Sequence, residues 1–166
     1  MESQYYEHIV RCKPSMAAKL LRIVSIVVFI LSLLMFSAGI LFALAGCLVM
    51  GGLFWYSNRE AGKEFEYVYV DGDISFDAVY NKSKRKSQLK TKWEETKLVC
   101  RGNAPELEGY RQKNAKTQNY TSNMKPMKDV YALVIEREGV PIIVYCEPAD
   151  EMIEMMWRKA PSKVKR

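Results

Sequence analysis

A cluster of Lys and Arg residues is the clearest candidate binding site in this sequence. The run Lys82–Lys86, here called the basic run, carries four positive charges in five residues. Each Lys or Arg held near an anionic lipid surface contributes roughly 1 kcal/mol of attraction. The pattern predicts contact with an anionic surface through Lys82, Lys84, Arg85, Lys86, Lys90 and Lys92. The alternative is a charged edge that keeps one β-sheet from pairing with another.

Residues that catalyse reactions or hold metals do not form a recognisable set. His8 is the single histidine, and it precedes the part of the chain expected to fold as a domain, so no Ser-His or Cys-His pair is expected there. Asp71–Asp77 has the opening spacing of an EF-hand loop, but Phe76 and Lys82 stand where that loop needs Gly and Glu. We therefore expect a non-enzymatic protein without a cofactor or a metal.

Charge and cysteine usage narrow the class of protein further. The net charge of +6 over 166 residues is mild, which suits a neighbour of an anionic leaflet better than a nucleic-acid binder. The four cysteines show no C-x-x-C spacing, so free thiols and a reducing compartment are expected; they are Cys12, Cys47, Cys100 and Cys146.

A long uncharged run of residues determines where the basic residues lie relative to a membrane. Ile23–Tyr56 holds 34 residues without Asp, Glu, Lys, Arg or His. As one helix it would extend ~51 Å, against ~30 Å of membrane hydrocarbon. We expect two short membrane helices, at about 16–36 and 40–56, joined by a turn at residues 37–39.

Residues that flank this run predict how it sits in a bilayer. Basic residues and an aromatic belt are expected at the interface, namely Lys19, Arg22, Trp55, Tyr56 and Arg59. Small residues such as Gly46 and Gly51 let two helices approach closely. Because basic residues lie at both ends, the positive-inside rule predicts two spans with both termini in the cytoplasm.

One competing interpretation involves Cys47. Leu44-Ala45-Gly46-Cys47 resembles a bacterial lipobox, in which the cysteine is lipidated after cleavage. This would make the protein a lipoprotein with its domain outside the cell. Against it, the residues that follow Cys47 are apolar rather than a polar tether.

The soluble part reads as strands followed by one helix. About seven strands are expected, at 64–70, 74–80, 88–93, 96–101, 116–120, 130–135 and 141–146, with tight turns at Asp71-Gly72 and Glu138-Gly139. A helix from Pro148 to Pro161 should place Met152, Met156 and Trp157 on one apolar face. Residues 5–10 are expected to form an interfacial helix.

These elements give an α+β fold and three parts. The parts are a short N-terminal cytoplasmic segment at 1–15, a transmembrane hairpin at 16–58 and a soluble domain at 59–166. Strands followed by a capping helix are the order of a pleckstrin-homology (PH)-like bent β-barrel, whose C-terminal helix would close one end.

Three stretches carry a family resemblance. They are Tyr67–Ile74, Asn81–Lys86 and Glu147–Met152. Together they resemble an uncharacterised family of small membrane proteins from Gram-positive, largely clostridial bacteria, with two transmembrane helices and a C-terminal PH-like domain. The resemblance implies the architecture and a bacterial source, and it supplies no catalytic residues.

The functional hypothesis follows from anchoring rather than catalysis. We expect a multi-pass protein of the bacterial cell membrane that presents the PH-like domain at the cytoplasmic leaflet. The domain would bind anionic lipid, a protein partner or a second copy of the chain, and neither a nucleic acid nor a small-molecule substrate. The other hypotheses are an accessory subunit of a larger membrane enzyme or transport complex, and the Cys47 lipoprotein.

Overall fold

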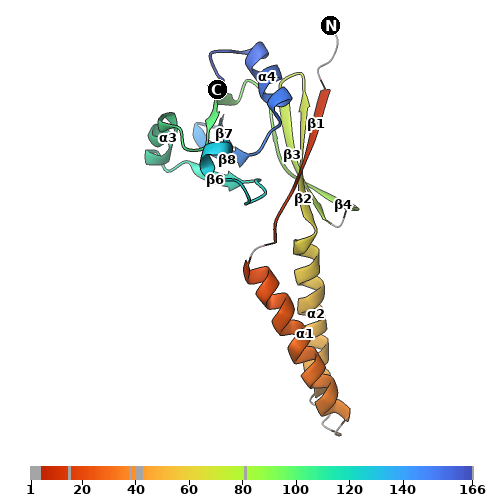
Figure 1. The fold of residues 1–166 in the computed structure, drawn as a ribbon. Coiled ribbons are helices and arrows are strands. Elements are labelled where there is room, and N and C mark those ends of the chain that lie inside the picture. Colours follow the sequence, from red (N-terminus) through yellow and green to blue (C-terminus); the bar gives the residue numbers. More distant parts are fainter. Residues whose placement is uncertain (1–4, 15, 38, 40–42, 81, 166) are drawn as a thin grey trace.

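The computed structural model describes residues 5–14, 16–37, 39, 43–80 and 82–165; the side chains at 17, 43 and 59–61 are left out of the description. Within this part, eight strands form two four-stranded sheets (Figure 1). Sheet A is antiparallel, in the order β1 (Tyr5–Arg11), β2 (Lys63–Val70), β3 (Asp73–Tyr80) and β4 (Lys84–Thr91). Sheet B has the order β5 (Thr96–Arg101), β7 (Tyr131–Arg137), β8 (Val140–Cys146) and β6 (Lys116–Asn119), with β6 parallel to β8.

Helices occupy three places in the fold. The helices α1 (Met16–Ser37) and α2 (Ala43–Ala61) extend away from the sheets as a pair (Figure 1). A short 3-10 turn, η1 (Pro105–Leu107), and α3 (Glu108–Gln112) follow β5, and a second turn, η2 (Met127–Asp129), precedes β7. The helix α4 (Asp150–Lys159) follows β8.

The N-terminal segment is a strand, and the predicted interfacial helix is wrong. Tyr5–Arg11 alternates between two faces, and its register with β2 sets Val10 opposite Phe65 on the apolar side. Val10 is buried in the core. The segment set apart as residues 1–15 therefore contributes a strand to sheet A, and the helix pair is inserted between two neighbouring strands.

The core lies between the two sheets. Alternate residues of β2 and β3 point inward, among them Tyr67, Phe76 and Ile74, and they pack with Leu133 of β7. The second face of sheet B packs on the segment that contains η1, through Leu107. Sheet B is thus covered on both faces, as the two apolar strands β7 and β8 predict.

Two tight turns are encoded locally. Asp71 and Gly72 both have positive φ, as do Glu138 and Gly139. Positive φ at both central residues belongs to the type I′ hairpin turn, which matches the twist of the flanking strands. Both predicted hairpins are confirmed by the pairing of β2 with β3 and of β7 with β8.

The closed barrel does not form among the described residues. The strands make two separate sheets, and β1 adds one strand to the seven expected. The helix α4 begins at Asp150 rather than at Pro148. It buries Met152, Ile153 and Met156 as expected, whereas Trp157 is 39% exposed, so the inward placement predicted for that residue is wrong.

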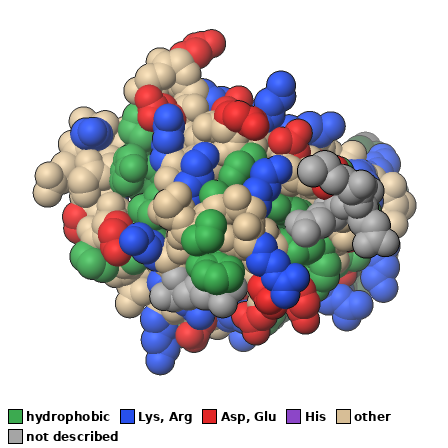
Figure 2. All heavy atoms as spheres, turned by 90° about the horizontal axis from the view of Figure 1, so that it is seen from above, with side chains coloured by type: hydrophobic (Ala, Val, Ile, Leu, Met, Phe, Trp, Pro, Cys, Tyr) green, Lys and Arg blue, Asp and Glu red, His purple; other side chains and the backbone are tan. Residues whose placement is uncertain are grey.

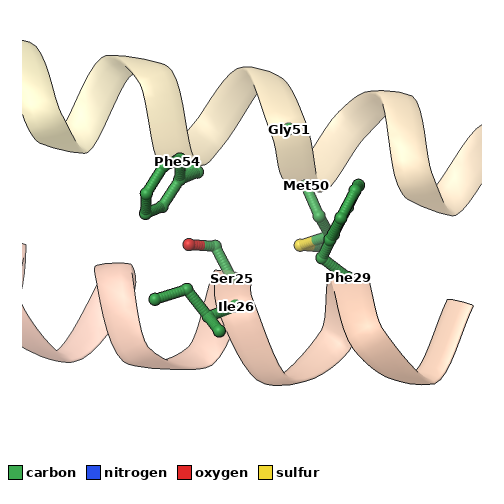
Figure 3. A pocket seen from close by; sticks show the side chains of 6 residues that line it. All are labelled: Ser25, Ile26, Phe29, Met50, Gly51 and Phe54. Atoms are coloured by element: carbon green, nitrogen blue, oxygen red, sulfur yellow. The ribbon is translucent and has the colours of Figure 1, made fainter. Parts of the chain in front are cut away.

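The helices α1 and α2 pack through small residues. A Cβ atom added at Gly46 would lie 2.8 Å from Ser32 Oγ, so glycine permits the close approach there. The Ser57 hydroxyl donates to the carbonyl of Ala18 across the pair at 3.2 Å. Between the helices lies a cavity of about 210 Å³ lined by Ser25, Ile26, Phe29, Met50, Gly51 and Phe54 (Figure 3).

One described helix has the length and composition of a membrane span. Ala18–Ser37 has a mean hydropathy of 2.5, and its side chains lie almost wholly outside the protein core. Its 20 residues extend about 30 Å, the thickness of the hydrocarbon layer. Signal sequences meet the same criterion. The described part of α2 does not meet it, because it ends in polar residues and residues 40–42 lie outside the description.

Candidate functional site

The basic run lies on an exposed edge strand. The sequence predicts a loop before a strand at 88–93, but the strand β4 already begins at Lys84. The strand is the last in the order of sheet A, so one of its edges is unpaired within the described chain. Lys84, Arg85 and Lys86 are exposed along this edge, as is Lys82 in the turn before it.

Strand register places this run at the end of sheet A from which the helices emerge. Lys84 pairs with Tyr80, Tyr80 with Lys63, and Lys63 follows the last turn of α2. The Cys12 amide donates to the Lys63 carbonyl at 3.1 Å, so the chain entering α1 lies at the same end. We call this the helix-proximal end of sheet A.

The six cations predicted to act together fall into two groups. Lys82, Lys84, Arg85 and Lys86 belong to the helix-proximal end. Lys90 pairs with Ser75, near the opposite end, and Lys92 follows the end of β4. Lys90 lies six positions after Lys84 along the strand, which is about 20 Å at ~3.3 Å per residue. One flat surface facing the helix-proximal end therefore does not include Lys90 and Lys92.

Arg85 also belongs to a charged cluster on the outer face of sheet A. Its guanidinium contacts the Glu66 carboxylate at 2.6 Å, and Glu66 is only 2% exposed. Burial raises the pKa of the Glu66 carboxyl, nearby Glu7 and Asp77 raise it further, and Arg85 partly offsets them. Arg85 thus has a structural partner as well as an exposed position.

The predicted interface anchors come together at the base of the helix pair. Lys19 and Arg22 lie in the first turns of α1 and are exposed, and Trp55 and Tyr56 lie exposed in the last turns of α2. The guanidinium of Arg22 lies 5.7 Å from the ring centroid of Phe54, which sets the two groups at one level. Arg59 is in α2, and its side chain is not described.

The end of the molecule opposite the helices carries a different distribution of charge. Viewed from that end, acidic, basic and hydrophobic side chains are interspersed (Figure 2). The α4 residue Lys159 donates to the carbonyl of Asp71 in the β2–β3 turn. Both signs of charge there argue against an anionic surface as its partner.

Three further cations of the helix-proximal end were not part of the predicted anionic surface, although Lys13 and Lys63 were counted among the basic residues that flank the apolar run. Arg11 ends β1 and contacts Glu64 at 3.2 Å, Lys13 follows that strand, and Lys63 begins β2. The signal was present in the alternation of Tyr5–Arg11, which was read as a helix. Only the pairing of β1 with β2 brings Arg11 and Lys13 near the basic run.

The remaining chemistry-bearing residues are placed as follows. His8 lies on β1 within sheet A, so its expected position outside the domain is wrong; its ring centroid is 6.1 Å from that of Tyr67, and burial lowers its pKa. None of the four cysteines is in a disulfide, Cys100 and Cys146 are buried, and burial raises the pKa of Cys100 to about 11. The described residues contain no cluster of His, Cys, Asp or Glu suited to a metal.

Comparisons with known proteins bear on the family resemblance. Neither curated proteins nor solved structures gave a match. A family model described as a bacterial PH-like domain, DUF6106, matches residues 2–166, which include β1, the helix pair and both sheets. The match confirms the resemblance to an uncharacterised bacterial PH-like family, while the Gram-positive source stays a prediction. The chain belongs to the bacterial PH-like domain family DUF6106.

Proposed function

We propose that this protein is a non-enzymatic membrane protein whose helix pair anchors the PH-like domain at the cytoplasmic leaflet. The basic helix-proximal end of sheet A then faces anionic lipid, and the rest of the domain is free to bind a protein partner. The observation that carries the proposal is the register of sheet A, which sets the basic run beside the emerging helices.

The pairing of β1 with β2 supports two spans. Because these strands are neighbours, the start of α1 and the end of α2 lie on the same side of any membrane. If α1 crosses the bilayer, the chain must cross again before β2. The residues that precede and include α2 are the segment available for the return.

Charge supports the cytoplasmic side. The helix-proximal end and the first turns of α1 carry a concentration of Lys and Arg close to the membrane helices, where the positive-inside rule applies. Anionic lipids of that leaflet attract such groups by roughly 1 kcal/mol each. The basic residues that contribute are Arg11, Lys13, Lys19, Arg22, Lys63, Lys82, Lys84, Arg85 and Lys86.

The fold argues against the Cys47 lipoprotein. Cleavage before Cys47 would remove β1 together with α1. It would take Val10 out of the core and leave β2 unpaired along that edge. An intact chain of 19.2 kDa in the membrane fraction, measured by mass spectrometry, is therefore expected.

Labelling in whole cells tests the topology. In a chain whose four native cysteines are replaced, single cysteines are introduced as Ser37→Cys, at the far end of α1, and Gln112→Cys, at the exposed end of α3. A membrane-impermeant maleimide should label Ser37→Cys alone. Labelling of Gln112→Cys in intact cells would place the domain outside and overturn the proposal, while labelling of both after lysis controls for reactivity.

A further inference from the structure

A polar pocket lies where the domain meets the helix pair. It has a volume of about 300 Å³ and is lined by Cys12, Lys13, Pro14, Ala18, Lys63, Phe65, Asn119 and Asn123. Four parts of the chain form it: the connection from β1 to α1, the first turn of α1, the start of β2, and the segment at the end of β6. The Lys13 amide donates to the Ser122 carbonyl at 3.1 Å, which ties the connection to that segment.

Positive charge dominates this pocket. Lys13 and Lys63 are its charged lining residues, and no carboxylate is among the described residues that line it. The ammonium of Lys63 is positioned 4.8 Å from the centroid of the Phe65 ring. By contrast, the depression on the outer face of sheet A is lined by three glutamates as well as cations. The pocket beside α1 therefore favours an anion.

The two asparagines add hydrogen-bond donors. The Asn123 carboxamide oxygen accepts from Asn119 Nδ2 at 3.3 Å and from Thr121 Oγ1 at 3.4 Å. The Asn119 oxygen accepts from the Thr121 amide at 3.0 Å. Since the acceptor atoms are used within the segment, the Nδ2 group of Asn123 is left to donate to a ligand.

The level of the pocket identifies the kind of anion. Ala18 lines the pocket and lies in the first turn of α1, five residues before the uncharged run begins at Ile23, so the pocket lies beside the boundary of that run. Phospholipid phosphates lie at that boundary in a bilayer. We propose that the pocket binds the phosphate headgroup of one anionic phospholipid, an inference that rests on the proposed membrane anchoring.

Native mass spectrometry of the full chain in detergent tests the assignment. With phosphatidylglycerol added, the wild-type chain should retain one lipid, and with phosphatidylcholine it should retain at least tenfold less. Asn123→Asp keeps the acceptor oxygens and suits the positive φ of 59° at this position, but it places a negative charge in the pocket. It should lower phosphatidylglycerol retention at least tenfold.

A second pair of variants separates charge in the pocket from charge elsewhere. Lys13→Gln/Lys63→Gln should lose the lipid as Asn123→Asp does, whereas Lys90→Gln/Lys92→Gln removes the same charge at the far end and should retain it. Equal retention by Asn123→Asp and by the wild type would overturn the proposal. Loss in the far-end control alone would overturn it as well.

Two further readouts separate the possible outcomes. One tells a lipid phosphate from free inorganic phosphate, and the other tells a failure of the pocket assignment from a failure of the proposed membrane anchoring. If millimolar inorganic phosphate displaces the retained lipid completely, the pocket is a site for free phosphate and the lipid assignment is wrong. If Asn123→Asp retains lipid while Gln112→Cys is still protected in cells, the pocket assignment fails and the anchoring stands. If Gln112→Cys is labelled outside, the anchoring itself fails.

Discussion

The central strand β7 of sheet B and the edge strand β4 of sheet A differ in how much of each is buried. In β7 of sheet B, five consecutive residues, Tyr131–Ile135, are buried, since both faces are covered. In β4 of sheet A, only Leu89 and Thr91 are buried among the described residues. The strand β4 packs one face on the core and leaves the other to solvent, whereas the outer face of the inner strands β2 and β3 buries Glu66 and Asp77. The core is shared by both sheets, through residues such as Tyr67 and Phe76 of sheet A and Leu133 of β7, whereas the edge strand β4 is available for binding beside the helices.

The largest expected effect tests the contrast between the buried strand β7 and the exposed edge strand β4. Leu133→Ala removes a side chain that is 0% exposed, and we expect it to lower the free energy of unfolding by about 3–4 kcal/mol. Ser87→Ala, on the exposed edge of β4, should change it by less than about 0.5 kcal/mol. Chemical denaturation of the detergent-solubilised chain measures both. A large effect at Ser87 would break the contrast between the two strands.

A matched pair of double variants tests the helix-proximal end against the far end of sheet A. Lys84→Gln/Lys86→Gln should weaken docking of the edge on an anionic bilayer by about 2 kcal/mol, roughly 30-fold in the docked ratio. Lys90→Gln/Lys92→Gln removes the same charge and should have a much smaller effect.

A fluorescent probe reports this docking. It is attached to Ser83→Cys in the chain without native cysteines, and the protein is placed in lipid discs of phosphatidylcholine with or without phosphatidylglycerol. The emission should depend on phosphatidylglycerol in the wild type and lose that dependence in the Lys84/Lys86 variant. Equal responses of the two double variants would mean that distance from the helices does not matter.

A smaller effect is expected at the buried carboxylate of sheet A. Because the pKa of Glu66 is raised in the folded protein, its ionised form costs folding free energy. The cost is absent below the ordinary pKa of 4.5 and appears as pH rises through the folded value. Glu66→Gln should therefore match the wild type at pH 4 and be more stable at pH 7.

Arg85 provides the complementary variant. Arg85→Gln leaves the buried Glu66 carboxyl without its cationic partner, and we expect a loss of about 1–2 kcal/mol at pH 7, less than for a fully buried pair since the Arg85 side chain is 58% exposed. Adding Glu66→Gln should restore stability. Thermal unfolding of the four chains at both pH values completes the cycle, and a stability loss in Glu66→Gln at pH 7 would contradict the assigned direction.

Some of the candidate site was readable from the sequence. The basic run and the interface anchors Trp55 and Tyr56 were identified from charge and from the end of the apolar run, which are properties of neighbouring residues. Arg11 and Lys63 were missed as parts of one surface because they are distant in sequence. Alternation along β2 sets Glu66 on the face opposite Phe65 and Tyr67, and its burial there beside Arg85 of β4 follows only from the pairing of the strands.

The sequence by itself determined what depends on residues close together in the chain. The apolar length of α1, the period-two strands and the positive φ values at Asp71-Gly72 arise from local composition. The tertiary structure decided which strands are neighbours. It paired Tyr5–Arg11 with β2 across the inserted helices, set β6 parallel to β8, and separated Lys84 from Lys90 by the length of a strand. Strand pairing depends on the burial of apolar side chains that are far apart in the sequence. A pattern of neighbouring residues therefore cannot predict it.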